Sequence, residues 1–91
     1  EKVTAIIPTY NEEVHIEEAI NSVSFADEII VIDSFSTDRT VELANKYAVK
    51  LIQRVFDDFP SQKNYAIDKA EHNWIYILDA DERVSEELRL E

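Results

Sequence analysis

The 91-residue sequence contains no cysteine, no methionine and no glycine. Without cysteine, disulfide bonds and thiolate metal sites are excluded, which is consistent with a cytoplasmic protein. The lack of glycine is unusual for a chain with many loops, because glycine usually supplies turns with positive φ. Apolar runs stay well below the ~20 residues of a membrane-spanning helix, and no secretory signal pattern is present. We expect a cytoplasmic location, or peripheral association of the whole protein with the inner face of the membrane.

Positive charge is also scarce. Nine Lys and Arg residues stand against 20 Asp and Glu residues, which gives a formal net charge of −11. A balance of this sign repels phosphate backbones, so we expect no nucleic-acid partner. A single anionic ligand can still bind where a metal ion or helix N-termini offset the local field.

The size and the two ends of the chain favour part of a larger domain. The hydrophobic content of 45% is ordinary for a globular fold, and 91 residues suit one small domain or a piece of one. The chain starts at Glu1 rather than at a methionine, and residues 85–91 resemble the first turns of a helix that is cut short. We expect residues 1–91 to be a single partial domain.

Four apolar runs alternate with segments of helical periodicity. The runs predict strands over residues 3–7, 28–33, 49–54 and 74–78, the first of them ended by Pro8. Alternation of this kind predicts right-handed crossovers and helices on both faces of a parallel sheet. The predicted fold class is therefore α/β, a Rossmann-like sheet of about four strands with three to four helices. If the last strand is central, Trp74 and Ile77 are shielded from solvent.

Helix signals lie in the segments between the strands. Asn11 is the expected N-cap of the first helix, and Ser36 or Thr37 is the expected N-cap of the second. Pro60 suits the first turn of a third helix, which we expect to run to about Ala70.

The last strand ends directly in an Asp-x-Asp pair, Asp79 and Asp81. In open α/β sheets, ligands bind at the edge where the strands have their carboxyl ends. Two carboxylates that flank one small residue can hold a divalent cation such as Mg²⁺ or Mn²⁺, and the cation can hold a diphosphate. The sequence does not fit a calcium-binding EF-hand, because Val84 occupies the place of its glycine. The plain alternative is a solvated acidic turn, although two adjacent acids repel each other unless something binds them.

Polar and aromatic residues follow the other strands at the same expected edge. Pro8 stiffens the exit from the first strand, and Tyr10 has a flat face on which a base can stack. Asp33 ends the second strand, and its carboxylate can accept hydrogen bonds from a nucleoside or serve only as a turn residue. Lys63 on the third helix is either a point charge for a diphosphate or a solvated lysine.

In order along the chain, the blocks IPTYNEE, VIDSFSTDRT, SQKNYA and ILDADE resemble the family 2 glycosyltransferases of the GT-A fold. The resemblance covers residues 7–82. It implies that this N-terminal part binds a nucleotide-diphospho-sugar, with UDP as the expected nucleotide and Mn²⁺ or Mg²⁺ as the cofactor. The implied roles are a nucleoside pocket lined by Pro8, Tyr10 and Glu12, a base contact from Asp33, a nucleotide contact from Lys63, and a metal and diphosphate site at Asp79 and Asp81.

The second block departs from the family pattern. Where the family usually reads Asp-Asp-Gly-Ser, this chain reads Asp33-Ser34-Phe35-Ser36, so that the second acid and the glycine are replaced. Within the family, the wording of the blocks is most similar to bacterial glucosyltransferases that build the lipopolysaccharide inner core.

The resemblance also implies what lies outside this chain. Inverting members of the family use a general base that follows the Asp-x-Asp motif at some distance, and the acceptor site lies there too. We therefore expect residues 1–91 alone to be inactive, while the whole protein transfers a sugar to a glycan or glycolipid hydroxyl. The competing hypothesis is a non-catalytic acidic α/β module that binds a divalent cation or a protein partner.

Overall fold

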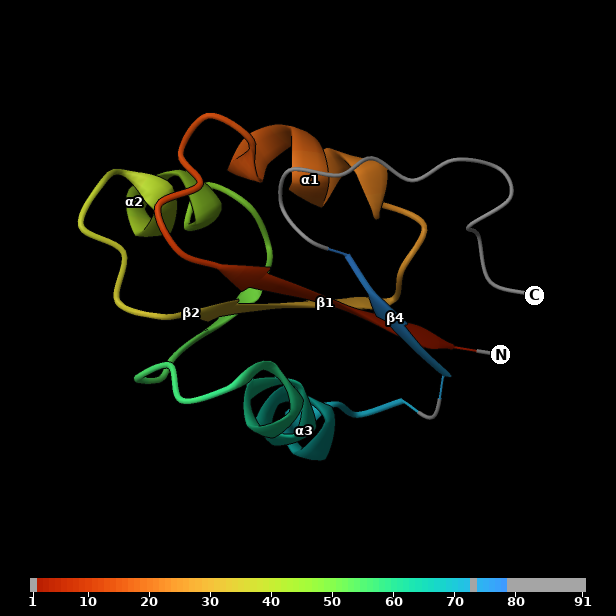
Figure 1. The fold of residues 1–91 in the computed structure, drawn as a ribbon. Coiled ribbons are helices and arrows are strands. Elements are labelled where there is room, and N and C mark those ends of the chain that lie inside the picture. Colours follow the sequence, from red (N-terminus) through yellow and green to blue (C-terminus); the bar gives the residue numbers. More distant parts are fainter. Residues whose placement is uncertain (1, 73, 79–91) are drawn as a thin grey trace.

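A computed structural model describes residues 2–72 and 74–78 (Figure 1). The elements in chain order are β1 (Val3–Thr9), α1 (Ile16–Ser22), β2 (Glu28–Asp33), α2 (Thr40–Ala44), β3 (Lys50–Gln53), α3 (Phe59–Lys69) and β4 (Trp74–Ile77). The strands form one sheet in the order β3-β2-β1-β4, and each neighbouring pair is parallel. Helices α1 and α2 cover one face and α3 covers the other (Figure 1). The predicted Rossmann-like α/β fold is confirmed.

The core lies on both faces of the two central strands, because successive residues of a strand point to opposite sides. Ile7 and Val31 belong to the buried cluster under α1 and α2. Ile6, Ile30 and Ile32 pack on the other face, in a cluster with a residue of α3. This arrangement explains why β1 and β2 are almost continuously apolar: neither strand has a face that meets water.

Strand β1 continues through Pro8, contrary to the prediction that Pro8 would end it. Pro8 is paired in register with Ile32, and the ladder ends one residue later. The backbone N–H of Leu78 donates to the carbonyl of Ile6 at 3.0 Å, so the backbone polar groups of Ile6 point toward β4. The backbone of Pro8, two residues on, has the same orientation. Its missing N–H therefore removes no hydrogen bond to β2.

The first two helices begin later than predicted. Helix α1 has His15 as its N-cap and α2 has Arg39, so the predictions of Asn11 and of Ser36 or Thr37 as N-caps were wrong. The physical reason is that all three residues take part in contacts between two loops, described below.

Helix α3 agrees with the sequence prediction. Pro60 lies in its first turn, and the Asp58 side chain accepts from the Ser61 N–H at 2.7 Å as a cap. The helix ends at Lys69, with Ala70 as its C-cap. In the described part of the chain, no helix is both long and apolar enough to cross a membrane.

Strand β4 is an edge strand within the described residues, which corrects the expectation that it is central. It pairs with β1 alone in this part of the chain. Trp74 is 43% exposed, so the prediction that its ring is shielded was wrong. Ile77 is partly buried, and Tyr76 makes an edge-to-face contact with Phe25 at 5.9 Å between ring centroids.

Candidate functional site

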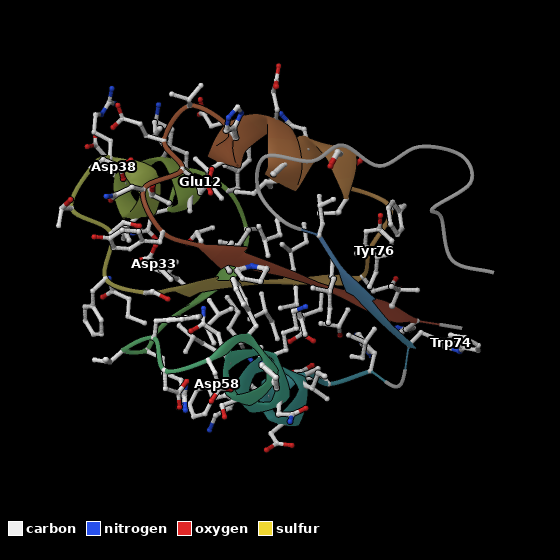
Figure 2. All side chains as sticks on the ribbon, viewed as in Figure 1. Glu12, Asp33, Asp38, Asp58, Trp74 and Tyr76 are labelled. Atoms are coloured by element: carbon white, nitrogen blue, oxygen red, sulfur yellow. The ribbon has the colours of Figure 1, made fainter. Side chains whose placement is uncertain are left out.

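Two loops meet where β1 and β2 stop pairing. We call residues 10–15 the first rim loop and residues 34–39 the second rim loop. The last register pair is Thr9 with Asp33, and the Ser34 N–H then donates to the Thr9 carbonyl at 2.9 Å. Figure 2 shows Glu12, Asp33 and Asp38 together at this edge. The predicted convergence of these two strand ends is present.

Asp33 is buried, and protein donors surround its carboxylate. One oxygen accepts from the Thr9 hydroxyl at 2.6 Å and from the Ser36 hydroxyl at 2.5 Å. The other accepts from the Ser36 N–H at 2.8 Å and from the Gln53 side-chain amide at 3.3 Å. A carboxylate offers about four acceptor positions, and all of them are used here. Asp33 therefore fixes the geometry of the edge, and its predicted contact to a base requires one donor to be exchanged.

The residues predicted to line a nucleoside pocket differ in accessibility. Tyr10 is 56% exposed, so a large part of its ring is open to a stacking partner. Pro8 is buried inside β1. Glu12 is partly buried, and its backbone N–H donates to the Thr40 hydroxyl at 2.8 Å, which ties it to the first residue of α2. Of these three residues, Tyr10 is the exposed one.

Lys63 projects from α3, on the opposite face of the sheet from α1 and α2. Its ammonium nitrogen lies 5.9 Å from the centroid of the Phe59 ring, within the range of a cation–π contact. In the described structure, the ammonium group of Lys63 thus lies near the Phe59 ring. The contact of Lys63 to a nucleotide remains a prediction.

The neighbouring Gln62 has a contact that the sequence did not predict. It is 2% exposed, and its side-chain nitrogen donates to the Ser34 hydroxyl at 3.1 Å. This pair joins the second rim loop to α3, on the face of the sheet that α3 covers. The available signal was helical spacing, because Gln62 lies four residues before the buried Ala66 and shares its face.

The loop after β3 is held by charge. Arg54 makes two hydrogen bonds to the Asp57 carboxylate, at 2.8 and 3.1 Å, and its guanidinium carbon lies 5.2 Å from the Tyr65 ring centroid. The hydrogen bond from Arg54 lowers the pKa of Asp57 to about 2. This loop ends at Asp58, the cap of α3, so the charge pair holds the approach to that helix.

The predicted metal ligands Asp79 and Asp81 lie outside the described residues. Strand β4 runs parallel to β1 and is directed toward the same edge of the sheet as β1 and β2. Within residues 2–72 and 74–78, no group of three or more His, Cys, Asp or Glu side chains is arranged to hold a metal ion. The metal assignment remains a prediction.

The family model for glycosyl transferase family 2 matches residues 4–91 of the chain. An uncharacterized glycosyltransferase of Rickettsia bellii is 44% identical over 89 residues, which cover 97% of this chain and 30% of that protein. The lipopolysaccharide core biosynthesis glycosyltransferase LpsC of Rhizobium meliloti is 30% identical, over 96% of this chain and 34% of its own length. The chain thus spans about a third of the length of these two relatives.

Solved structures share the fold. The crystal structure of S. aureus TarS 1–349 has a TM-score of 0.81 and 31% identity, over 96% of this chain and 29% of that one. Glucosyl-3-phosphoglycerate synthase from Mycobacterium tuberculosis, in complex with Mn²⁺, UDP and glucosyl-3-phosphoglycerate, has a TM-score of 0.78 and 25% identity, over 88% and 33% of the two chains. These relatives carry transferase or synthase names, and none supports a non-catalytic module. With its family match over residues 4–91, the chain belongs to glycosyl transferase family 2.

Proposed function

We propose that the whole protein is an inverting glycosyltransferase that takes a sugar from a UDP-linked donor, and that this chain binds the donor. The observation that carries the proposal is the pair of rim loops joined at the carboxyl edge of β1 and β2. Open α/β sheets bind ligands at this edge. Further support comes from two relatives of the same fold, TarS in complex with UDP-GlcNAc and the M. tuberculosis synthase in complex with Mn²⁺ and UDP.

Residues of the rim would hold the nucleoside. Tyr10 offers its exposed ring as a stacking face for the base, with Pro8 and Glu12 beside it. Asp33 would serve twice, because it orders the edge and also accepts from the base. The donor that can be exchanged is Gln53, whose 3.3 Å bond is the longest of the four to Asp33.

Charged residues would hold the diphosphate. Asp79 and Asp81 supply carboxylate oxygens, which suit the hard cations Mg²⁺ and Mn²⁺. A cation bound there would neutralise charge on the departing nucleoside diphosphate. Lys63 would approach the nucleotide as a point charge.

The remaining polypeptide would supply the general base and the acceptor site, so residues 1–91 alone would be inactive. We propose a glycan or glycolipid acceptor in lipopolysaccharide or other cell-surface glycan synthesis, and a cytoplasmic enzyme that works at the inner face of the membrane. The support for this acceptor class is the name of LpsC, a lipopolysaccharide core biosynthesis glycosyltransferase.

A titration of residues 1–91 with UDP and Mg²⁺ or Mn²⁺ tests donor binding. Amide signals of Tyr10 and of the residues next to Asp33 are expected to shift at millimolar UDP. The signals of Ala48 and Val49, which precede β3 at the opposite edge of the sheet, are expected to stay in place. No shift at the rim at millimolar UDP contradicts donor binding by this chain. In the whole enzyme, Asp81→Ala is expected to abolish transfer almost completely, and normal turnover of that variant would refute the metal assignment.

A further inference from the structure

Asn11 makes hydrogen bonds to the second rim loop in both directions. Its side-chain oxygen accepts from the Thr37 N–H at 2.7 Å, the Asp38 N–H at 3.3 Å and the Thr37 hydroxyl at 3.3 Å. Its own N–H donates to the Ser36 hydroxyl at 2.8 Å. A single exposed side chain thus receives three donors from a segment that lies 26 or 27 residues further along the chain.

The backbone of Asn11 is left-handed, with φ of 53°. Asparagine is one of the few residues apart from glycine that adopt this conformation readily. The turn carries the chain out of β1 and brings the Asn11 amide against the second rim loop. Glycine would satisfy the backbone as well, but it would provide no acceptor for Thr37 and Asp38. The residue type therefore meets two requirements at one position.

Other contacts between the rim loops follow from this placement. The Glu13 N–H donates to the Asp38 carboxylate at 3.2 Å, and the Glu13 carboxylate accepts from the Arg39 N–H at 2.9 Å. Asp38 also accepts from the N–H of Thr40 at 2.9 Å. The rim loops are consequently one hydrogen-bonded unit, in which Asn11 directly follows the exposed Tyr10.

From this geometry we infer that Asn11 is a positioning residue for the donor nucleotide. It locks the first rim loop to the second, so that Tyr10 and the end of β2 are presented in a fixed arrangement before the ligand arrives. A site whose loops are already ordered loses less conformational entropy on binding. The inference rests on the proposed function, because it assigns a role at the same edge without assigning a contact between Asn11 and the ligand.

Three variants of the whole protein separate the backbone requirement from the hydrogen bonds. Asn11→Gly keeps the left-handed turn and removes the acceptor, whereas Asn11→Asp keeps an acceptor oxygen in a residue that tolerates this turn. Asn45→Gly is the matched control, because Asn45 is an exposed asparagine at the C-cap of α2, outside the rim loops. The measurements are the affinities for UDP with Mg²⁺ and for uridine, and the hydrogen exchange of the Thr37 and Asp38 amides.

In Asn11→Gly we expect roughly tenfold weaker binding of UDP and of uridine, together with faster exchange at Thr37 and Asp38. Asn11→Asp should restore slow exchange and most of the uridine affinity. Uridine is the suitable ligand for this variant because it has no phosphate that the new carboxylate could repel. Asn45→Gly should bind both ligands like the wild type. The inference is overturned if wild type and Asn11→Gly bind equally, or if Asn45→Gly weakens binding as much. If the wild type itself binds no UDP at millimolar concentration, both the inference and the proposed function fail.

Discussion

The Thr9 hydroxyl donates to the buried Asp33 carboxylate at 2.6 Å, at the last register pair of β1 and β2. This bond closes the ladder with side chains where the backbone pairing ends. Ser36 and Gln53 donate to the same carboxylate, so that a single acid joins β1, β3 and the second rim loop at the end of β2. We therefore expect that replacement of Asp33 lowers the free energy of unfolding.

Asp33→Asn is expected to lower the free energy of unfolding by about 2–3 kcal/mol, because an amide group must turn its donor toward Thr9, Ser36 or Gln53 and leave buried donors unmatched. Urea unfolding measures the change. Asp27→Asn is the control, since Asp27 is exposed and accepts one backbone N–H, from Val3. Equal losses in the two variants would contradict the account of Asp33.

Phe35 occupies the position where the family usually has glycine, and it has a φ of 60°. A side chain in this left-handed region costs about 1–2 kcal/mol relative to its absence. Phe35→Gly and Phe35→Ala both remove the ring, so a comparison of the two isolates the backbone term. We expect the glycine variant to be about 1 kcal/mol more stable than the alanine variant in urea unfolding. Equal stability would show that the turn relaxes when the ring is lost.

The Arg54–Asp57 pair makes a prediction about pH. The pKa of Asp57 in the folded protein is about 2, below the ordinary value of 3.8 for this side chain. Because the folded-state value is depressed, the contribution of the pair to stability is present above pH 3.8 and is lost as the pH falls toward about 2. NMR titration of the Asp57 carboxyl carbon should have its midpoint near 2, and Arg54→Gln should move that midpoint upward. A midpoint that Arg54→Gln leaves unchanged would assign the shift to another cause.

The bond between Gln62 and Ser34 should appear as a pairwise coupling. Gln62→Met keeps most of the buried volume, and Ser34→Ala removes the hydroxyl. A double-mutant cycle of the two substitutions is expected to give a coupling energy of about 1 kcal/mol in thermal or urea unfolding. Exposed Asn64 on the same helix provides the control partner, with Asn64→Ala expected to be additive with Ser34→Ala. A coupling near zero for Gln62 would mean that solvent replaces the bond.

The sequence was sufficient for the fold class and for the approximate positions of the strands. Between its two acids, the run of residues 28–33 is apolar on both faces, and this pattern is typical of strands that are covered on both sides. Pro60 likewise identified α3, because a first-turn proline is a local signal, whereas the cap at Asp58 was not predicted. Fold class and the common edge of the strand ends follow from such local patterns.

The contacts at the rim could not be predicted in the same way. Asn11 is a residue type that often serves as an N-cap, but its side chain accepts hydrogen bonds from Thr37 and Asp38. The proximity of these residues to Asn11 depends on the register of β1 with β2. Asp33 was correctly expected at the strand end, yet whether its carboxylate faces a ligand or the protein depends on donors from two other strands. Trp74 was misjudged because the order of strands in the sheet decides which of them lie at an edge.

The hydrogen bonds described between the two rim loops and into α2 all lie between residues 11 and 40. One β–α–β unit and the start of the next helix therefore contain both rim loops and the hydrogen bonds between them. A segment of this kind keeps the hydrogen bonds between its rim loops when it is moved as a piece, and loses the contacts of Asp33 with Gln53 and of Ser34 with Gln62. Laboratory chimaeras that join the chain to a different continuation after residue 40 should therefore preserve the hydrogen bonds between the two rim loops.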